Sequence, residues 1–177
     1  MNKKTDKYTN LIGFPGVLAI VVFIADQVSK IWIMHAFPTP GYSYHEIIPG
    51  FFNLVYFQNT GAAWGIFSRH TWLLGLFSAA AFFLIVYYYK RLTMGHVSLS
   101  FAYGLLLGGI VGNLYDRLIR GFVVDFLFFY WRDFQHSWPA FNVADSAISV
   151  SIVMLIVYDL FFLKNEKKSA EKKQGKK

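Results

Sequence analysis

Long apolar runs alternate with short polar segments along this chain of 177 residues. A helix needs about 20 mostly apolar residues to cross the hydrocarbon core of a bilayer. Four runs are long enough to qualify, at about residues 11–37, 71–89, 97–115 and 143–163. The second and third contain no charged residue and are separated only by a short basic loop, which predicts a tight helical hairpin. The third also carries Gly104, Gly108 and Gly112 on one helical face, a spacing that predicts close packing against a neighbouring helix.

The two segments that connect these runs on the other side, 38–70 and 116–142, differ in character. The first contains prolines and glycines followed by the apolar run 51–57, which is typical of a small β-element on the membrane surface. In the second, residues 122–138 are rich in Phe, Tyr and Trp, and aromatic rings favour the membrane interface. The predicted fold class is therefore an α-helical integral membrane protein with four transmembrane helices and a small β-element.

Composition agrees with a membrane protein and removes several kinds of chemistry. Hydrophobic residues make up 55% of the chain and charged residues only 15%, whereas a soluble domain carries about a quarter. Without cysteine the chain has no disulfide, no thiol nucleophile and no Cys-ligated zinc. The net charge of +7 comes largely from residues 164–177, which hold seven of the 17 basic residues. We interpret this segment as a disordered cytoplasmic tail, and we expect no nucleic-acid binding.

The distribution of Lys and Arg predicts the orientation, since short cytoplasmic loops are enriched in both. With four spans, the two termini and the Lys90–Arg91 loop share one side, which carries 12 basic residues against five on the other. Both termini are therefore predicted to be cytoplasmic. Residues 1–163 would form a single four-span domain whose first span is retained, because no small-x-small cleavage site follows it.

Ionisable and amide side chains gather at the outer ends of the predicted spans, although they are far apart in the sequence. A charge within an apolar helix is costly, so such residues are usually paired or functional. Asp159 lies roughly 21 Å deeper along the fourth span at 1.5 Å per residue and belongs to the opposite end. The members of the outer cluster are Asp26, Lys30, Asn59, Asn113, Asp116, Arg117, Asp125, Asn142 and Asp145.

Part of this cluster has a simple structural explanation. Asp26 and Lys30 are one turn apart and suit an ion pair within one helix. Asp116 stands near Arg117 and Arg120, which is typical of an interfacial salt bridge.

Among the other members of the cluster, two have a structural explanation and Asp125 does not. Asn142 is a good N-cap for the fourth span, and a carboxylate such as Asp145 is favoured in the first turn of a helix. Asp125 is harder to explain, because no basic residue lies within four positions of it.

The motifs that the chain lacks exclude several kinds of catalysis for this cluster. There is no HExxH pattern and the five histidines are scattered, so a metalloprotease is not indicated, and we expect no metal and no cofactor. No G-x-S-x-G motif is present either. Two carboxylates in a poorly solvated site can share a proton, one acting as base and the other as acid. A small transporter or proton channel would use the same residue types, and this alternative stays open.

Five ordered motifs between residues 26 and 146 resemble those of the lipoprotein signal peptidases, also called signal peptidase II. The pattern GG-x-x-GN-x-x-DR covers residues 108–117 and includes Gly109, Asn113 and Arg117. The other four are Asp26-Gln27-Val28-Ser29-Lys30, Asn59-Thr60-Gly61-Ala62-Ala63, Val124-Asp125-Phe126 and Phe141-Asn142-Val143-Ala144-Asp145-Ser146. Ile110 and Trp64 depart from the family, which commonly has a small residue and Phe at these positions.

The resemblance implies an aspartic endopeptidase that cleaves diacylglyceryl-modified prolipoproteins just before the lipidated cysteine, with Asp125 and Asp145 as the catalytic dyad. Membrane lipids and globomycin-type inhibitors would be further partners. It also implies supporting or substrate-binding roles for Asp26, Lys30, Asn59, Gly61, Ala62, Gly109, Asn113, Arg117 and Asn142.

The fold that the resemblance implies adds a periplasmic β-cradle and a periplasmic interfacial helix to the four helices. The protein would lie in the bacterial cytoplasmic (inner) membrane, with its active site near the periplasmic face. From the aromatic stretch 122–138 we further hypothesise a lid that closes over this site.

Overall fold

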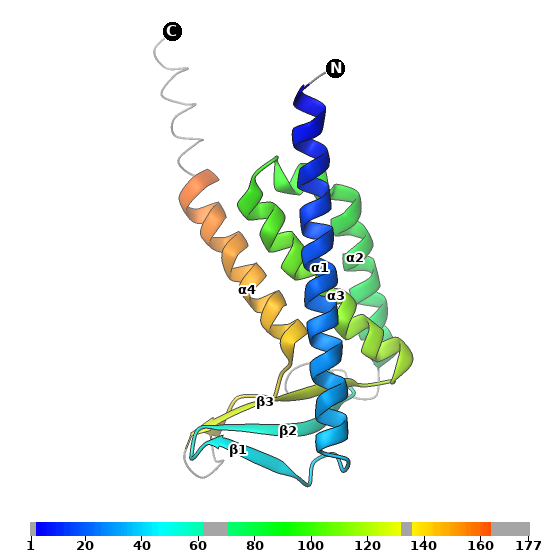
Figure 1. The fold of residues 1–177 in the computed structure, drawn as a ribbon, viewed down its shortest axis with the longest axis vertical. Coiled ribbons are helices and arrows are strands. Elements are labelled where there is room, and N and C mark those ends of the chain that lie inside the picture. The colour runs from blue at the N-terminus through cyan, green and yellow to red at the C-terminus, as the bar shows by residue number, and fades with distance from the viewer. Residues whose placement is uncertain (1–2, 62–70, 132–135, 164–177) are drawn as a thin grey trace.

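The computed structural model describes residues 3–61, 71–131 and 136–163, and it consists of four helices that stand on a small antiparallel sheet (Figure 1). The helices are α1 (Lys3–Ala36), α2 (Thr71–Thr93), α3 (Val97–Ile119) and α4 (Val143–Tyr158), which continues into a π-helical turn, η2 (Asp159–Leu163). The strands are β1 (Tyr44–Ile48), β2 (Phe52–Asn59), β3 (Val123–Trp131) and β4 (His136–Ser137). The predicted fold class is confirmed. The tail 164–177 lies outside the described residues.

Helices α1, α2 and α3, and α4 together with the start of η2, each contain a segment long and apolar enough to cross a membrane. Helices α2 and α3 end four residues later than the predicted spans, because the polar residues after 89 and 115 continue the helix. Many large apolar side chains point away from the bundle; Phe83 of α2, for example, is 69% exposed. Such extensive apolar surface is rare in soluble monomers and suits contact with lipid.

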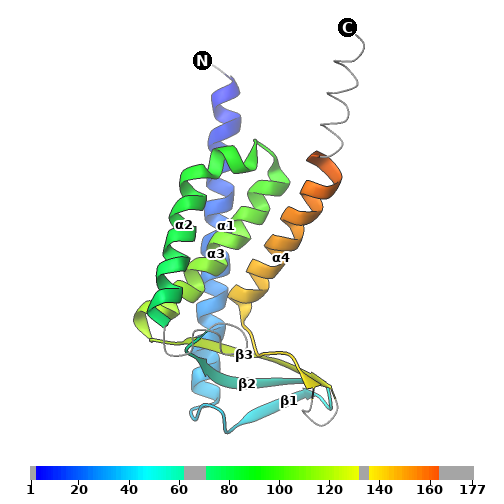
Figure 2. The ribbon, with the colours of Figure 1, turned by 180° about the vertical axis from the view of Figure 1, so that it is seen from behind.

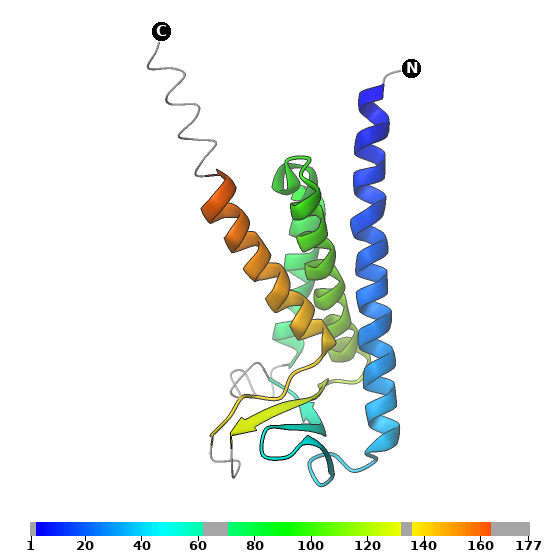
Figure 3. The same cartoon turned by 60° about the vertical axis from the view of Figure 1, so that its left-hand side comes forward.

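Helix α3 lies at the centre of the bundle, between α1, α2 and α4 (Figure 3). A side chain added at Gly108 would place its Cβ 2.7 Å from the carbonyl oxygen of Ala19 in α1. At Gly109 the Cβ would lie 2.5 Å from the carbonyl oxygen of Ala144 in α4. Gly104 and Gly112 also face α1 at close range, so the predicted packing role of this ladder is confirmed.

The sheet has the strand order β1-β2-β3-β4, and all neighbouring strands are antiparallel. Strand β2 corresponds to the apolar run predicted to form a β-element. Beyond an irregularity in β2 between Leu54 and Phe57, the register pairs Phe57 with Asp125. A small core of Ile33, Tyr56, Val124 and Phe126 joins the end of α1 to the sheet.

Within the aromatic stretch 122–138, Val123–Trp131 form β3 and His136–Ser137 form β4, and the lid role stays a hypothesis. The β-branched and aromatic residues of β3 suit a strand, and β3 is held by hydrogen bonds to β2 on one side and to β4 on the other. The predicted interfacial helix has no counterpart among the described residues of the two connecting segments. Residues 62–70 and 132–135, which belong to these segments, lie outside the described residues.

The sheet closes one end of the bundle, while α1 begins and η2 ends at the opposite end (Figure 2). The carboxyl ends of α1 and α3 and the amino end of α4 therefore meet at the sheet. This junction brings together polar residues from segments that are far apart in the sequence.

Candidate active site

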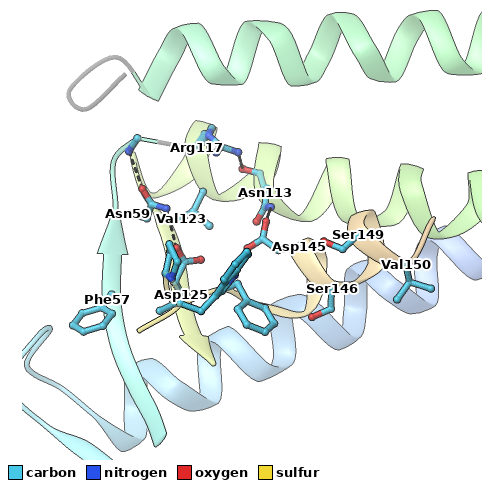
Figure 4. A pocket seen from close by; sticks show the side chains of 15 residues that line it. Phe57, Asn59, Asn113, Arg117, Val123, Asp125, Asp145, Ser146, Ser149 and Val150 are labelled. Atoms are coloured by element: carbon cyan, nitrogen blue, oxygen red, sulfur yellow. Dashed lines mark hydrogen bonds between the residues drawn. The ribbon is translucent and has the colours of Figure 1, made fainter. Parts of the chain in front are cut away.

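A cavity of about 850 Å³ lies at the junction between the sheet and the helices (Figure 4). Its walls come from β2, β3, α3 and α4, together with the chain that precedes α4. Both Asp125 and Asp145 line this cavity. Two of the predicted carboxylates, 20 residues apart in the sequence, thus face one space.

Asp125 projects from β3 and is buried, with 3% of its surface exposed. Its Oδ2 accepts a hydrogen bond from Nδ2 of Asn59 at 2.9 Å, and its Oδ1 accepts one from Nδ2 of Asn142 at 2.7 Å. Burial and, after it, the nearby charge of Asp145 raise the pKa of Asp125 from 3.8 to about 7. A carboxyl group with this pKa can hold or release a proton near neutral pH.

Asp145 lies in the first turn of α4, where it forms a capping box with Asn142. Oδ1 of Asn142 accepts the backbone N–H of Asp145 at 2.9 Å, and Oδ2 of Asp145 accepts the backbone N–H of Asn142 at 3.2 Å. The predicted N-cap is confirmed. Asn142 also contacts Asp125, so one residue caps the helix of one aspartate and holds the other.

Asn113 of α3 connects Asp145 to a buried lysine. Nδ2 of Asn113 donates to Oδ1 of Asp145 at 2.7 Å, while Oδ1 of Asn113 accepts Nζ of Lys30 at 3.1 Å and Nδ2 of Asn142 at 3.3 Å. An ammonium group can only donate, so the oxygen of this amide must face Lys30 and its nitrogen must face the carboxylate. The orientation of the Asn113 side chain is therefore determined.

Lys30 belongs to a buried group of charges behind the cavity. Its Nζ lies 2.8 Å from Oδ2 of Asp26 and 2.9 Å from Oδ2 of Asp116, and none of these three side chains is exposed. The predicted ion pair between Asp26 and Lys30 is confirmed. Asp116 is wholly buried rather than interfacial, and its partners are Lys30 and Arg120 instead of Arg117. The two acidic and two basic side chains balance in charge, as a buried group requires.

Arg117 lines the cavity close to both aspartates. One end of its guanidinium donates to the backbone oxygen of Asn113 at 3.3 Å. Its Nε is buried and has no hydrogen-bond partner among the described residues. A buried unpaired donor is costly, so the side chain is suited to bind an acceptor that enters the cavity.

Most of the predicted site residues meet at this junction, in two layers. The cavity is lined by Asn59, Gly61, Asn113, Arg117, Asp125 and Asp145. Behind it lie Asp26, Lys30 and Asn142. Gly109 makes the close approach to α4 and does not line the cavity, and Ala62 lies outside the described residues.

Several residues of the site were not predicted. Gln27 donates to the buried carboxylates of Asp26 and Asp116 behind the cavity. On α4, the cavity extends along Ser146, Ser149 and Val150. Ser149 stands four positions after Asp145, so helical spacing placed both on one face and was a usable signal. The stretch 138–141, another part of the wall, carries no such signal because it is irregular chain.

The arrangement suits acid–base chemistry on a water molecule. Two carboxylates that face one poorly solvated cavity do not both ionise readily, so they tend to share a proton. All four of their oxygens accept hydrogen bonds from asparagines, which keeps the pair in a defined orientation.

Comparison with known proteins gives the same family throughout. Residues 18–162 match the profile of a family described as signal peptidase (SPase) II. A lipoprotein signal peptidase of Symbiobacterium thermophilum is 45% identical over 142 residues, which cover 80% of this chain and 91% of the relative. One from Vibrio cholerae is 42% identical over 147 residues, covering 79% and 82% of the two chains.

Two solved structures share the fold, each described as a bacterial membrane enzyme studied by the in meso method. The structure at 2.3 Å resolution has a TM-score of 0.76 and 31% identity, and the match covers 87% of this chain and 92% of the other. The structure at 1.9 Å resolution has a TM-score of 0.73 and 32% identity, and the match covers 85% and 95%.

Proposed function

Since the chain belongs to the signal peptidase II family, we propose that it is an aspartic endopeptidase whose catalytic pair is Asp125 and Asp145. Family membership makes it a protease of the bacterial inner membrane that removes signal peptides from lipoproteins. In this proposal the substrate is a diacylglyceryl-modified prolipoprotein, and the cut falls just before the lipidated cysteine.

One observation carries the choice of this pair. Asp125 and Asp145 line the same cavity, and Asn142 binds both of them. Of the other aspartates at this end of the bundle, Asp26 and Asp116 are saturated by ion pairs behind the cavity. Asp133 lies outside the described residues.

The proposed reaction needs one proton shared by the pair. In the resting state near neutral pH the pair holds one proton, and the mechanism starts with it on Asp125, as a pKa of about 7 allows. Asp145 takes a proton from water while the water oxygen bonds to the scissile carbonyl carbon, and Asp125 gives its proton to the carbonyl oxygen.

The resulting gem-diol then collapses. Asp145 gives its proton to the amide nitrogen as the carbon–nitrogen bond breaks, and Asp125 takes back the proton of a diol hydroxyl as the carbonyl re-forms. The products are a carboxylic acid and an amine, and the pair returns to its starting protonation. Arg117, whose Nε has no partner in the described part of the chain, would bind a backbone carbonyl of the substrate beside the scissile bond.

The position of the cavity supports a lipid-anchored substrate. It lies where the helices meet the sheet, and it continues along α4 to Val150, which is 51% exposed on the apolar surface. A substrate held by two acyl chains presents its scissile bond near the membrane surface. The distribution of basic residues supports a periplasmic site with both termini cytoplasmic. A single domain over residues 1–163 stays a prediction. Membrane lipids and globomycin-type inhibitors stay predicted partners.

Cleavage of a purified lipidated prolipoprotein tests the proposal. The variants Asp125→Asn and Asp145→Asn keep the shape of each side chain but cannot exchange the proton, so each is expected to lower kcat by about a thousandfold or more. Asp159→Asn is the matched control, because Asp159 lies at the opposite end of α4. Full activity in both cavity variants would show that the pair is wrongly assigned.

The transporter or channel alternative finds less support. A path across the membrane needs ionisable groups at several depths. The buried charged residues of the described chain instead gather at the cavity: Asp125 lines it, and Asp26, Lys30 and Asp116 form one ion-paired group behind it.

A further inference from the structure

The residues that immediately precede the two aspartates of the cavity are held in the same way. The backbone N–H of Val124 donates to Oδ2 of Asp116 at 3.2 Å. The backbone N–H of Ala144 donates to Oδ1 of Asp26 at 2.9 Å. Val124 and Ala144 have no exposed surface, so neither N–H can turn to water instead. Two carboxylates outside the cavity thus hold the backbone on which the cavity aspartates are mounted.

Lys30 joins these two carboxylates into one unit. Its ammonium group lies 2.8 Å from Asp26, 2.9 Å from Asp116 and 3.1 Å from Oδ1 of Asn113. An ammonium group has three N–H donors, so each is used once. The third contact reaches Asp145 through the Asn113 side chain. Lys30 Nζ therefore connects to three parts of the site, each through one intervening side chain. These parts are the β3 backbone, the α4 backbone and the side chain of Asp145.

Packing leaves this unit little freedom to move. A Cβ at Gly112 would lie 2.6 Å from Oδ2 of Asp26, so the carboxylate rests directly on the α3 backbone. The side-chain nitrogen of Gln27 donates to Oδ2 of Asp26 at 3.0 Å and to Oδ1 of Asp116 at 3.2 Å. Both carboxylates are thus held by neutral donors as well as by Lys30.

We propose that Asp26, Lys30 and Asp116 are positioning residues that set the separation of Asp125 and Asp145 by fixing the backbone N–H groups of Val124 and Ala144. The inference rests on the proposed function, because it presumes that the two cavity aspartates work as a pair. One lies on a strand and the other on a helix, and their relative position depends on contacts between the two elements. Displacements of about 1 Å are enough to lower catalysis by about a hundredfold.

Asp116→Asn and Asp26→Asn test the proposal, since an amide has roughly the shape of a carboxylate but pairs poorly with several donors. Each variant is expected to lower kcat per folded molecule by about tenfold or more, with KM changed less than about threefold. A role limited to stability would change the folded fraction and leave kcat per folded molecule unaltered. Tyr130→Phe is the matched control. Tyr130 lies on β3, as Val124 does, but it does not line the cavity, and the change removes its hydrogen bonds to Glu46 and Asn53.

Amide NMR of protein labelled at Val and Ala supplies a second readout. An N–H bonded to a carboxylate is strongly hydrogen-bonded and resonates at low field. Asp116→Asn is expected to shift the Val124 signal most, and Asp26→Asn the Ala144 signal most, because each N–H donates directly to the altered side chain. If these variants do not fold, Gln27→Met, which removes the neutral donor to both carboxylates together with an acceptor of Arg120, is expected to shift both signals and to lower kcat.

The outcomes separate this inference from the proposed function. Inactive Asp125→Asn and Asp145→Asn proteins together with unchanged kcat in the Asp26 and Asp116 variants would overturn the positioning role alone. The same holds if the Gln27 variant is the only one that folds and its kcat is unchanged. Active Asp125→Asn and Asp145→Asn proteins would overturn the proposed function itself.

Discussion

Asn142 donates a 2.7 Å hydrogen bond from Nδ2 to Oδ1 of Asp125 while it caps the helix that carries Asp145. A single side chain therefore ties β3 to the first turn of α4. The common use of Asn as a helix cap explains only half of this arrangement. The other half, the contact with the strand, makes the cap part of the site.

Asn142→Ala is expected to affect stability and activity together. Loss of the cap costs about 1 kcal/mol, and Asp125 loses one of its two hydrogen-bond donors, so kcat should fall by about tenfold or more. Thermal unfolding in detergent and cleavage of a lipidated substrate measure the two effects. His96→Ala is the matched control, because His96 occupies the N-cap of α3 without a side-chain cap bond. Wild-type kcat in Asn142→Ala would contradict the coupling.

Cleavage should depend on pH through the proton held by Asp125. Because its pKa is about 7, a rise in pH above that value removes the shared proton and should lower kcat/KM about tenfold per pH unit. A pH–rate profile of the solubilised enzyme measures this limb. Activity that stays constant up to pH 9 would show that the proton is not required.

The same carboxyl group should make stability depend on pH. Its pKa is raised from 3.8 to about 7 on folding, so the folded protein binds the proton more tightly than the unfolded chain. The stabilisation is complete below about pH 4 and is lost as the pH rises through about 7, a loss on the order of a few kcal/mol. Asp125→Asn should flatten this dependence between pH 4 and 7 in thermal unfolding experiments. An unchanged slope would contradict the raised pKa.

The close approach of α3 and α4 gives a prediction about packing. Gly109→Ala would place a methyl group 2.5 Å from the Ala144 carbonyl, so the two helices must separate. We expect a loss of several kcal/mol in stability and a loss of activity, because Asp145 follows Ala144. Gly16→Ala on α1 is the matched control, since no atom lies within 4 Å of the added group. Equal melting temperatures for the two variants would count against this packing.

Arg117 provides a prediction about substrate binding. Its guanidinium lines the cavity, and its Nε has no partner among the residues that the structure describes. Arg117→Lys keeps the charge but loses the planar set of donors, so KM should rise by about tenfold while kcat changes little. Steady-state kinetics measure the two constants separately. A fall in kcat with constant KM would place Arg117 in the chemistry of the pair instead.

The hydrophobic pattern predicted the four helices because a membrane span depends on local composition alone. The strand at 52–59 also follows from a local signal, because its apolar run lies between turn-forming residues. The aromatic stretch 122–138 predicts an interfacial segment, because aromatic residues suit the membrane interface as well as a strand. The pairing of Val123–Trp131 with β2, some 70 residues earlier in the chain, makes this part a strand.

Contacts across the bundle were beyond prediction from one sequence. The neighbours of Asp116 in the chain predict an interfacial salt bridge with Arg117 and Arg120, and the ion pair with Arg120 is present. A second partner, Lys30, lies on another helix, and this pair depends on the close approach of α1 and α3 at their glycines. The set of polar residues at one face could be derived from span positions. Which of them line the cavity and which lie behind it depends on helix rotation.

The dependence of the site on α4 has a consequence for biogenesis. Asp125 emerges from the ribosome before Asn142, its donor from the last helix, and Asp26 waits for the N–H of Ala144. A nascent chain that has inserted only its first three helices carries one cavity aspartate and lacks the other. In the proposed mechanism both aspartates are needed, so cleavage would begin only after the final helix has been inserted and has docked against α3.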